Sequence, residues 1–125
     1  MISKELLIEV LGIEVEKVSI NGKVINYTVP NYEAEEDGEI IFIDLGMGIN
    51  IYELAHKCKE WAFKLDYILE SAFIPISGTF TASYCKIEKQ FACQNNKKTF
   101  HGDTETEAIF KACEWILNKE RENDK

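Results

Sequence analysis

The sequence predicts an α+β fold in which an antiparallel sheet packs against helices. Apolar residues recur every three or four positions in two segments, 51–72 and 105–118, as in helices that bury one face. Shorter segments of strand character, bounded by turn residues, lie before and between them. The chain has 125 residues, 46% of them apolar, which is enough for one globular core. We therefore expect a single domain over residues 1–125.

The negative charge of the chain is concentrated near its N-terminus. The chain has 22 acidic and 14 basic residues, for a net charge of −8. Residues 1–48 hold ten acids and three bases, whereas residues 49–125 hold twelve and eleven. This division suggests an acidic helix and hairpin piece, 1–48, joined to a helix-sheet-helix body, 49–120. An acidic total argues weakly against nucleic-acid binding as a general property.

The chain shows no segment typical of membrane insertion or export. No apolar run approaches the roughly 18 to 20 residues that span a bilayer. The first five residues lack the basic-then-apolar pattern of a secretory signal. We expect a cytoplasmic protein with no membrane contact.

The first two elements are predicted by local signals. Ser3 is a helix cap, and Gly12 is a stop signal after the apolar stripe that includes Leu6. The pair Asn21-Gly22 then predicts a two-residue hairpin turn. In that register Ile20 lies opposite Lys23 and one side faces the core, carrying Val18, Ile20, Ile25, Tyr27 and Val29.

An acidic segment follows the hairpin and is the predicted partner-binding surface. Pro30 is expected to end the strand, and a solvated loop should surround Gly38. Its acids lack the ligand order of a calcium loop, so we expect no metal there. The run 40–43 is apolar on both faces, which predicts a central strand. The acids of the predicted surface are Glu33, Glu35, Glu36, Asp37 and Glu39.

Residues 51–72 carry the strongest helical pattern, with Asn50 as its cap. Its end stays open, because residues 67–69 fit a helix or a strand. A helix that reaches residue 72 would extend beyond a small sheet and offer a homodimer contact through its stripe. The turn at Gly46–Gly48 is the predicted seam between the two parts of the chain. We interpret it as a flexible turn, since it lacks the third glycine of a phosphate-binding loop.

Residues 81–100 predict two further strands and an alternative site. A three-residue loop over 88–90 pairs Ile87 with Phe91, and Phe100 then lies across from Phe91. In this register Tyr84 and Lys86 share a polar face. Such a face offers a nucleic-acid or nucleotide site as an alternative function. Its residues are Tyr84, Lys86, Lys89, Lys97 and Lys98.

The remaining reactive residues predict no enzyme, metal or cofactor. The four cysteines contain no Cys-x-x-Cys pair and are interpreted as core thiols, with a Cys85–Cys93 disulfide and a metal site as alternatives. His56 and His101 are interpreted as surface residues.

A last helix should start after Thr104, and residues 119–125 should fray.

Two segments are similar to parts of known proteins. The first begins Asn50-Ile51-Tyr52-Glu53-Leu54 and continues to residue 62, and the second begins Thr104-Glu105-Thr106-Glu107-Ala108 and continues to residue 117. They resemble small phage and prophage proteins of helix-sheet-helix type. The resemblance implies an accessory protein that acts through protein contacts, such as inhibition of a basic host protein, and it assigns no functional residue. The order of elements is also similar to a double-stranded RNA-binding domain. Acids replace the lysine cluster of that domain, at positions 103, 105 and 107.

Overall fold

A computed structural model describes residues 2–88, 92–93 and 98–123 and has an α+β fold, as predicted. Its strands pair in antiparallel fashion throughout the described part. In chain order the elements are α1 (Lys4–Leu11), β1 (Glu16–Asn21), β2 (Val24–Glu36), β3 (Glu39–Asn50), α2 (Ile51–Lys64), β4 (Tyr67–Ile74), β5 (Thr79–Glu88), β6 (Ala92–Cys93), β7 (Thr99–Gly102) and α3 (Glu105–Asn123).

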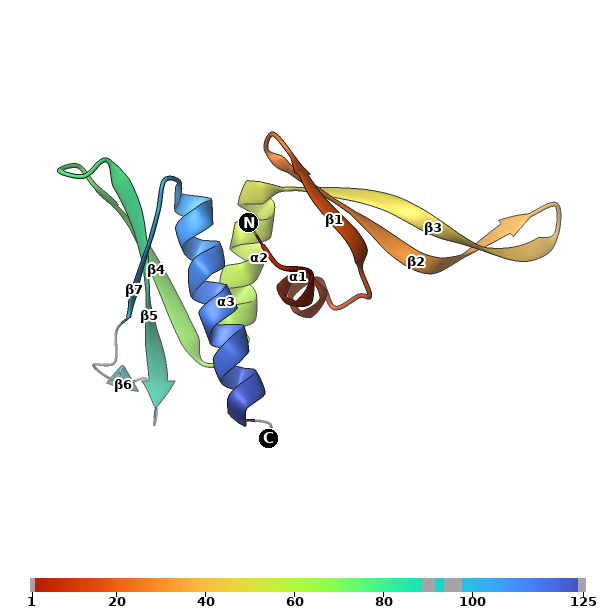
Figure 1. Cartoon of the computed structure of the whole chain (residues 1–125). Coiled ribbons are helices and arrows are strands. Elements are labelled where there is room, and N and C mark those ends of the chain that lie inside the picture. The colour runs from red at the N-terminus through yellow and green to blue at the C-terminus, as the bar shows by residue number, and fades with distance from the viewer. Residues whose placement is uncertain (1, 89–91, 94–97, 124–125) are drawn as a thin grey trace.

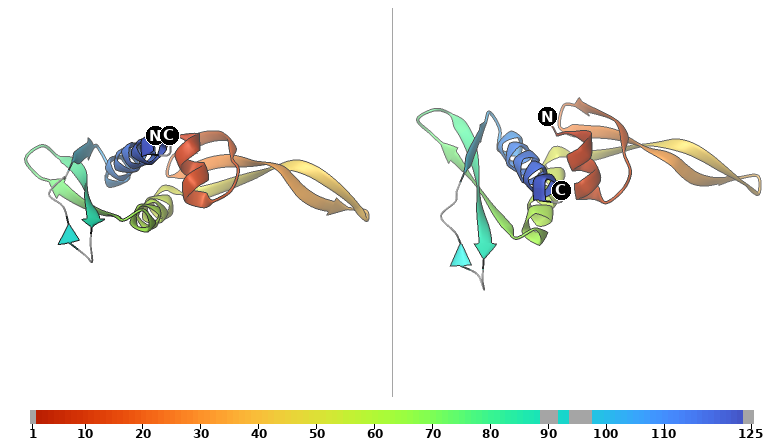
Figure 2. Two further views of the ribbon diagram at one scale, coloured as in Figure 1. Left: turned by 90° about the horizontal axis from the view of Figure 1, so that it is seen from below. Right: turned by 60° about the horizontal axis from the view of Figure 1, so that its bottom comes forward.

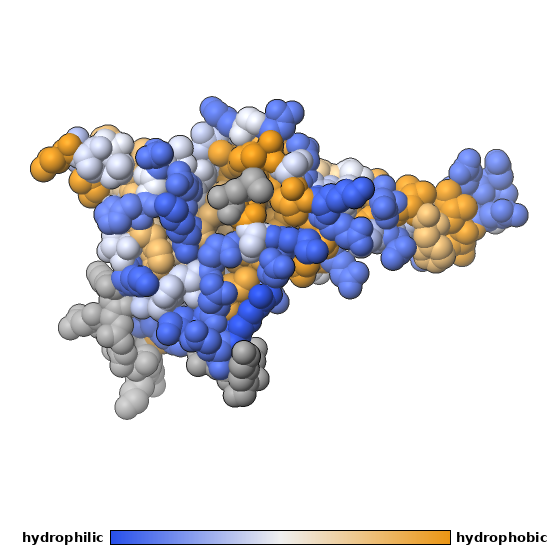
Figure 3. All heavy atoms as spheres, viewed as in Figure 1, coloured by the Kyte–Doolittle hydropathy of each residue, from blue (hydrophilic) through white to orange (hydrophobic). Residues whose placement is uncertain are grey.

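Two sheets lie on opposite sides of a layer formed by α2 and α3 (Figure 1). One sheet has the order β1-β2-β3 and carries α1 beside it; in the other, β5 pairs with β4 along one edge and with β6 and β7 along the other. The two further views show the same layers (Figure 2). The outer part of β2 and β3 projects away from all other elements (Figure 3).

Local capping explains where α1 and α2 begin. The Ser3 hydroxyl accepts a hydrogen bond from the Leu6 N–H at 3.1 Å, and Gly12 ends α1 with a left-handed φ of 69°. Asn50 caps α2 by accepting from the Tyr52 N–H at 2.9 Å. These three cap predictions are confirmed.

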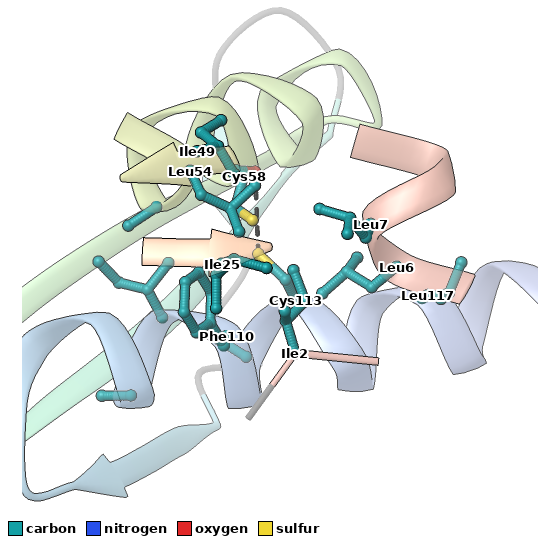
Figure 4. Close-up of a cluster of buried hydrophobic side chains, with 14 of the residues drawn as sticks. Ile2, Leu6, Leu7, Ile25, Ile49, Leu54, Cys58, Phe110, Cys113 and Leu117 are labelled. Carbon is teal, nitrogen blue, oxygen red and sulfur yellow. Dashed lines mark hydrogen bonds between the residues drawn. The ribbon is translucent and has the colours of Figure 1, made fainter. Parts of the chain in front are cut away.

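The main core joins both parts of the chain. Its fully buried side chains come from α1, β2, α2, β5 and α3, so the first 48 residues pack on the same cluster as the helices (Figure 4). Ser3 adds a polar link, because its N–H and hydroxyl donate to the Glu114 carboxylate of α3 at 2.8 and 2.9 Å. The largest fully buried side chains are Leu6, Leu7, Ile25, Leu54, Ile109, Ile116, Cys58 and Cys113.

The β1–β2 hairpin has a different register from the predicted one. Ile20 pairs with Ile25, so the two loop residues are Gly22 and Lys23, and Gly22 has a φ of 63°. A shift of two positions keeps every side chain on its predicted face. Ile25 and Tyr27 are accordingly buried, although Ile20 remains 50% exposed.

The helix predicted over 51–72 ends at Lys64. Asp66 adopts a φ of 69°, and β4 begins at Tyr67, so the strand alternative for 67–69 is confirmed. Ile68 and Ala72 therefore belong to a sheet. The extended helical stripe on which a homodimer contact was expected does not form.

Strand pairing after residue 80 also differs from prediction. Phe100 lies opposite Ala82 of β5, because β7 pairs with the middle of β5, and Ile87 lies opposite Cys93. Phe91 lies outside the described residues. The C-terminal segment does not fray at 119: α3 continues to Asn123, and Lys119 pairs with Glu122 at 3.5 Å.

Replacing Ser3 should weaken the link between α1 and α3. Ser3→Ala removes the cap of α1 and the hydroxyl bond to Glu114, so we expect the free energy of unfolding to fall by about 2 kcal/mol. Urea denaturation followed by circular dichroism measures this change. Ser19→Ala, at an exposed position of β1, is the control and should change it by less than about 0.5 kcal/mol. Equal effects of the two substitutions would contradict the assignment.

Candidate interaction surface

The outer half of β2 and β3 forms a two-stranded ribbon, which we call the arm (residues 29–45). β1 pairs only with residues 24–28 of β2, so beyond Thr28 the two strands pair with each other alone. The arm projects from the body in every view (Figures 1 and 2). The prediction that the acidic segment forms a loop is therefore wrong, because its glutamates lie on paired strands.

The tip of the arm is a tight turn at Asp37-Gly38. These residues have φ values of 51° and 80°, and type I′ hairpin turns need positive φ at both central positions. Glu36 pairs with Glu39 directly across the turn. The Asp-Gly dipeptide is itself a hairpin signal, and the loop predicted around Gly38 is this two-residue turn.

Pro30 lies inside β2 instead of ending it. The register of β2 against β3 shifts between Val29 and Tyr32, and Asn31 adopts a φ of 51°. A bulge leaves a residue outside the ladder, so a proline without an N–H is accommodated there. The strand therefore continues past Pro30.

One side of the arm, which we call the apolar face, carries no charged side chain between its base and Ala34. Residues directly opposite each other in an antiparallel pair share a face. Tyr32 is 46% exposed and its partner Ile43 39% exposed. At the base, Val29 packs against the main core. The apolar face consists of the pairs Val29–Leu45, Tyr32–Ile43 and Ala34–Ile41.

The other side, the acidic face, combines two large apolar side chains with carboxylates. Phe42 is 66% exposed and lies opposite Glu33; Ile40 is 63% exposed and lies opposite Glu35. Asp44 follows on the same side of β3. The prediction that residues 40–43 form a central strand is wrong, because β3 is an edge strand of its sheet.

The arm is strongly negative. It holds six acids and no lysine or arginine, and the space-filling view shows a hydrophobic band next to a hydrophilic tip (Figure 3). Such a potential attracts positively charged molecules and repels negative ones. The predicted surface residues Glu33, Glu35, Glu36, Asp37 and Glu39 are thus all brought together on the outer half of one ribbon.

The alternative nucleic-acid surface does not form as predicted. Tyr84 is only 8% exposed and stacks on Trp115 of α3 at a centroid distance of 4.6 Å. Burial is the main cause that raises the pKa of Tyr84, and the neighbouring Tyr67 raises it further. The expected solvent-facing position is therefore wrong for Tyr84, whereas Lys86, on the same side of β5, is half-buried. Lys89 and Lys97 lie outside the described residues.

Three lysines nevertheless gather around this aromatic cluster. The Lys98 and Lys119 ammonium groups lie 5.6 and 5.5 Å from the Trp115 ring centroid. The Lys86 ammonium lies 4.9 Å from the centroid of Tyr67. The packing of α3 on β5 therefore creates a small positive patch that includes Lys119, which the sequence did not indicate.

The cysteines give no nucleophilic centre among the described residues. Cys58 and Cys113 are buried free thiols, as predicted, and the Cys113 thiol donates to the Cys58 carbonyl at 3.8 Å (Figure 4). The hydrogen bond with Cys58 and burial raise the pKa of the Cys113 thiol. Cys85, in contrast, is disulfide-bonded, so its interpretation as a core thiol is wrong. The side chain of Cys93 is not part of the described structure.

The histidines and acids of the described part form no metal-binding cluster. His56 pairs with Glu60 at 2.9 Å on the exposed surface of α2, and His101 is exposed on β7, both as expected. Within the described ranges no group of three or more histidine, cysteine or acidic side chains is close enough to hold a metal ion.

Gly46 and Gly48 do not form the predicted turn. They lie within β3, opposite Thr28 and Asn26, in front of a shallow hollow of about 450 Å³. The prediction of a flexible turn at this position is therefore wrong. β3 continues without interruption past Gly46 and Gly48 and leads directly into α2.

Comparison with models of known protein families, with curated proteins and with solved structures found no match to this chain. Among the described helices, none combines the length and apolar character needed to cross a bilayer. The candidate surface therefore rests on the chain's own geometry and chemistry.

The two buried thiols should resist modification. Because the raised pKa keeps Cys113 protonated and α2 and α3 cover both sulfurs, iodoacetamide at neutral pH should leave Cys58 and Cys113 unmodified for hours. Mass spectrometry of the digested protein measures the labelled fraction. In denaturant both should react within minutes. Fast labelling of Cys113 in the native protein would contradict its burial and its protonation.

Proposed function

We propose that this chain is a small non-enzymatic binding protein that acts in the cytoplasm and uses its arm to bind a basic protein partner. The observation that carries the proposal is the acidic face, where Phe42 and Ile40 stand exposed between carboxylates. Large apolar side chains supply most of the affinity of protein contacts, and surrounding charges supply orientation and association rate.

The partner that fits this face is a protein surface with an apolar pocket and lysines or arginines around it. Burial of Phe42 in such a pocket removes apolar area from water, and Glu33 and Glu35 meet the cations at its rim. The projecting shape allows the arm to enter a concave site, such as the substrate cleft of a basic enzyme.

The biological setting that we propose is that of a phage or prophage accessory protein that inhibits a host factor. The resemblance of segments 50–62 and 104–117 to small phage and prophage proteins supports this setting. An anionic inhibitor fits nucleic-acid-processing enzymes best, because their binding clefts are positively charged.

The experiment that tests the proposal compares two pairs of substitutions. Affinity capture from host lysate after nuclease treatment identifies the partner, which is then purified and titrated by calorimetry. Phe42→Ser with Ile40→Ser should raise the dissociation constant at least about tenfold, since the apolar anchors are lost. Glu33→Gln with Glu35→Gln should flatten its dependence on salt.

The β4–β5 hairpin supplies the matched control. Phe73 and Ile76 are 52% and 100% exposed, so Phe73→Ser with Ile76→Ser removes a similar apolar area from another tip. This variant should bind the partner normally. If the control weakens binding as much as the arm variant does, or if neither changes it, the arm is not the binding surface.

A second candidate function is binding of nucleic acid at the lysine patch, and the gathering of Lys86, Lys98 and Lys119 favours it. Because Tyr84 is buried, such binding would use phosphates without base stacking on that ring. Lys98→Ala with Lys119→Ala should then weaken binding of single-stranded RNA or DNA and lower its salt dependence by about two ion equivalents. Fluorescence anisotropy at low salt measures both. Absence of binding by the unmodified protein would exclude this candidate.

A further inference from the structure

We propose that the free edge of β3 binds an extended segment of the basic partner, which adds to the sheet as a further antiparallel strand. The inference rests on the proposed function and deepens it, because it names the backbone atoms and the kind of partner segment that make the contact. The edge runs over residues 40–48, and among the described strands only β2, on the opposite side, pairs with β3 (Figure 1).

The backbone groups of β3 that face this edge follow from the turn at the tip and from one hydrogen bond at the base. The two-residue turn closes with a hydrogen-bonded pair that includes Glu39, and such pairs alternate along a ladder, so Ile41 and Ile43 also bond to β2. At the other end of the strand, the Ile51 N–H donates to the Lys23 carbonyl at 2.9 Å, which continues the same odd-numbered series. The residues that direct their N–H and C=O groups to the free edge are therefore Ile40, Phe42, Asp44, Gly46 and Gly48.

These outward-facing residues also lie on the side of the acidic face. Ile40, Phe42 and Asp44 belong to that face, and the two glycines continue the same side of β3 toward the body. In an antiparallel pair, two residues that exchange both hydrogen bonds lie directly opposite each other and share a face. Alternate residues of an added strand would thus bond to β3 and at the same time place their side chains beside the apolar anchors and the acids.

The two edges of the arm differ in how well they are protected from pairing. Charged side chains, proline and bulges keep edge strands from adding to other chains. Along β2 the outward positions hold Glu33 and Glu35, and Pro30 lies in a bulge. Residues 40–48 of β3 include no proline, no lysine and no bulge of their own, and their one charge is that of Asp44. The edge of β3 is therefore the one open to an added strand.

The glycines leave room for the added strand at the base of the arm. A glycine inside a strand often marks a place where another backbone approaches closely. Beyond its chain neighbours, a Cβ added at Gly46 would meet no described heavy atom within 4 Å, and the shallow hollow of about 450 Å³ lies in front of Gly46 and Gly48. Ser19, Asn26 and Lys17 also line the hollow, so it suits an uncharged polar side chain better than a second cation.

Charge decides which extended segment fits the edge. The arm holds six acids and no lysine or arginine, so it attracts a segment with cations at alternate positions. A second copy of β3 would instead bring the acids of two arms together, which repulsion disfavours. The expected ligand is a strand with lysines or arginines beside Phe42 and Asp44 and an uncharged residue over the hollow.

Synthetic peptides test the proposal on the unmodified protein. A peptide of about eight residues that alternates lysine and valine can direct all its lysines to the acidic face. Methylation of the backbone nitrogens of its two central lysines removes N–H groups aimed at β3 and should weaken binding at least about tenfold. The same change at its two central valines affects N–H groups that face solvent, and should alter binding less than about threefold. NMR titration measures both. Equal effects, or full binding of the lysine-methylated peptide, would overturn the inference.

The same titration reports on the edge itself. The amide protons of Ile40, Phe42 and Asp44 should move downfield when the peptide binds, because they gain hydrogen bonds. Those of Ile41 and Ile43 are already bonded to β2 and should shift less. Shifts without this alternation, or shifts centred on the β4–β5 hairpin, would contradict strand addition.

A pair of substitutions carries the test to the captured partner. Asp44→Pro removes an outward N–H and a charge, whereas Asp44→Asn removes the charge alone. Proline is tolerated at an edge position whose N–H faces solvent, and circular dichroism checks that both variants fold. Calorimetry should show that Asp44→Pro weakens binding at least about fivefold more than Asp44→Asn does.

These results separate the inference from the proposed function. If the partner needs Phe42 and Ile40 but binds the two Asp44 variants equally, the arm uses side chains alone and strand addition is wrong. If the peptides bind with the expected alternation but the arm substitutions leave binding of the partner unchanged, the proposed function is wrong and the edge site stands. A dimer that Asp44→Pro weakens, detected by sedimentation velocity without peptide, would assign the edge to a second copy and overturn the choice of ligand.

Discussion

The pairing of β2 with β3 is the interaction on which the rest of the molecule depends. At its inner end this hairpin contributes Ile25 and Ile49 to the core, is extended by β1, and leads through Asn50 into α2. At its outer end the same ladder of hydrogen bonds continues, and no other described strand or helix pairs with it or covers it. One continuous hairpin thus serves as a structural element at one end and as an exposed ribbon at the other, and the bulge at Pro30–Asn31 marks the point where one role passes into the other.

Local chemistry made much of the fold predictable. The caps at Ser3, Gly12 and Asn50 depend on a few neighbouring atoms, so the sequence specifies them fully. The face assignment of the β1–β2 hairpin was also correct, because alternation fixes a side chain's face even when the register is wrong by two positions. Register itself depends on the turn conformation, and two turns that differ by one residue compete at Asn21-Gly22-Lys23. Periodicity did not reveal where α2 ends either, since the four-residue step from Ile68 to Ala72 suits a helix and a strand equally.

The candidate surface was predictable in its charge and unpredictable in its shape. Clustered acids identified the segment, but an apolar run such as 40–43 has the same pattern in a buried central strand as in an exposed two-stranded ribbon. Periodicity reports which side chains avoid water; it does not report what covers them. The lysine surface failed for a related reason. Tyr84 and Cys85 are both buried, and Tyr84 is covered by Trp115, which lies about thirty residues further along the chain.

The separation of the arm from the core has an evolutionary consequence. Beyond Val29 its side chains take no part in the core clusters of the described chain, so substitutions there leave the packing of α1, α2 and α3 untouched. Substitutions in the arm can therefore accumulate while the scaffold keeps its stability. Sequences related by descent should diverge fastest at the arm and slowest around Leu54, Cys58 and Cys113.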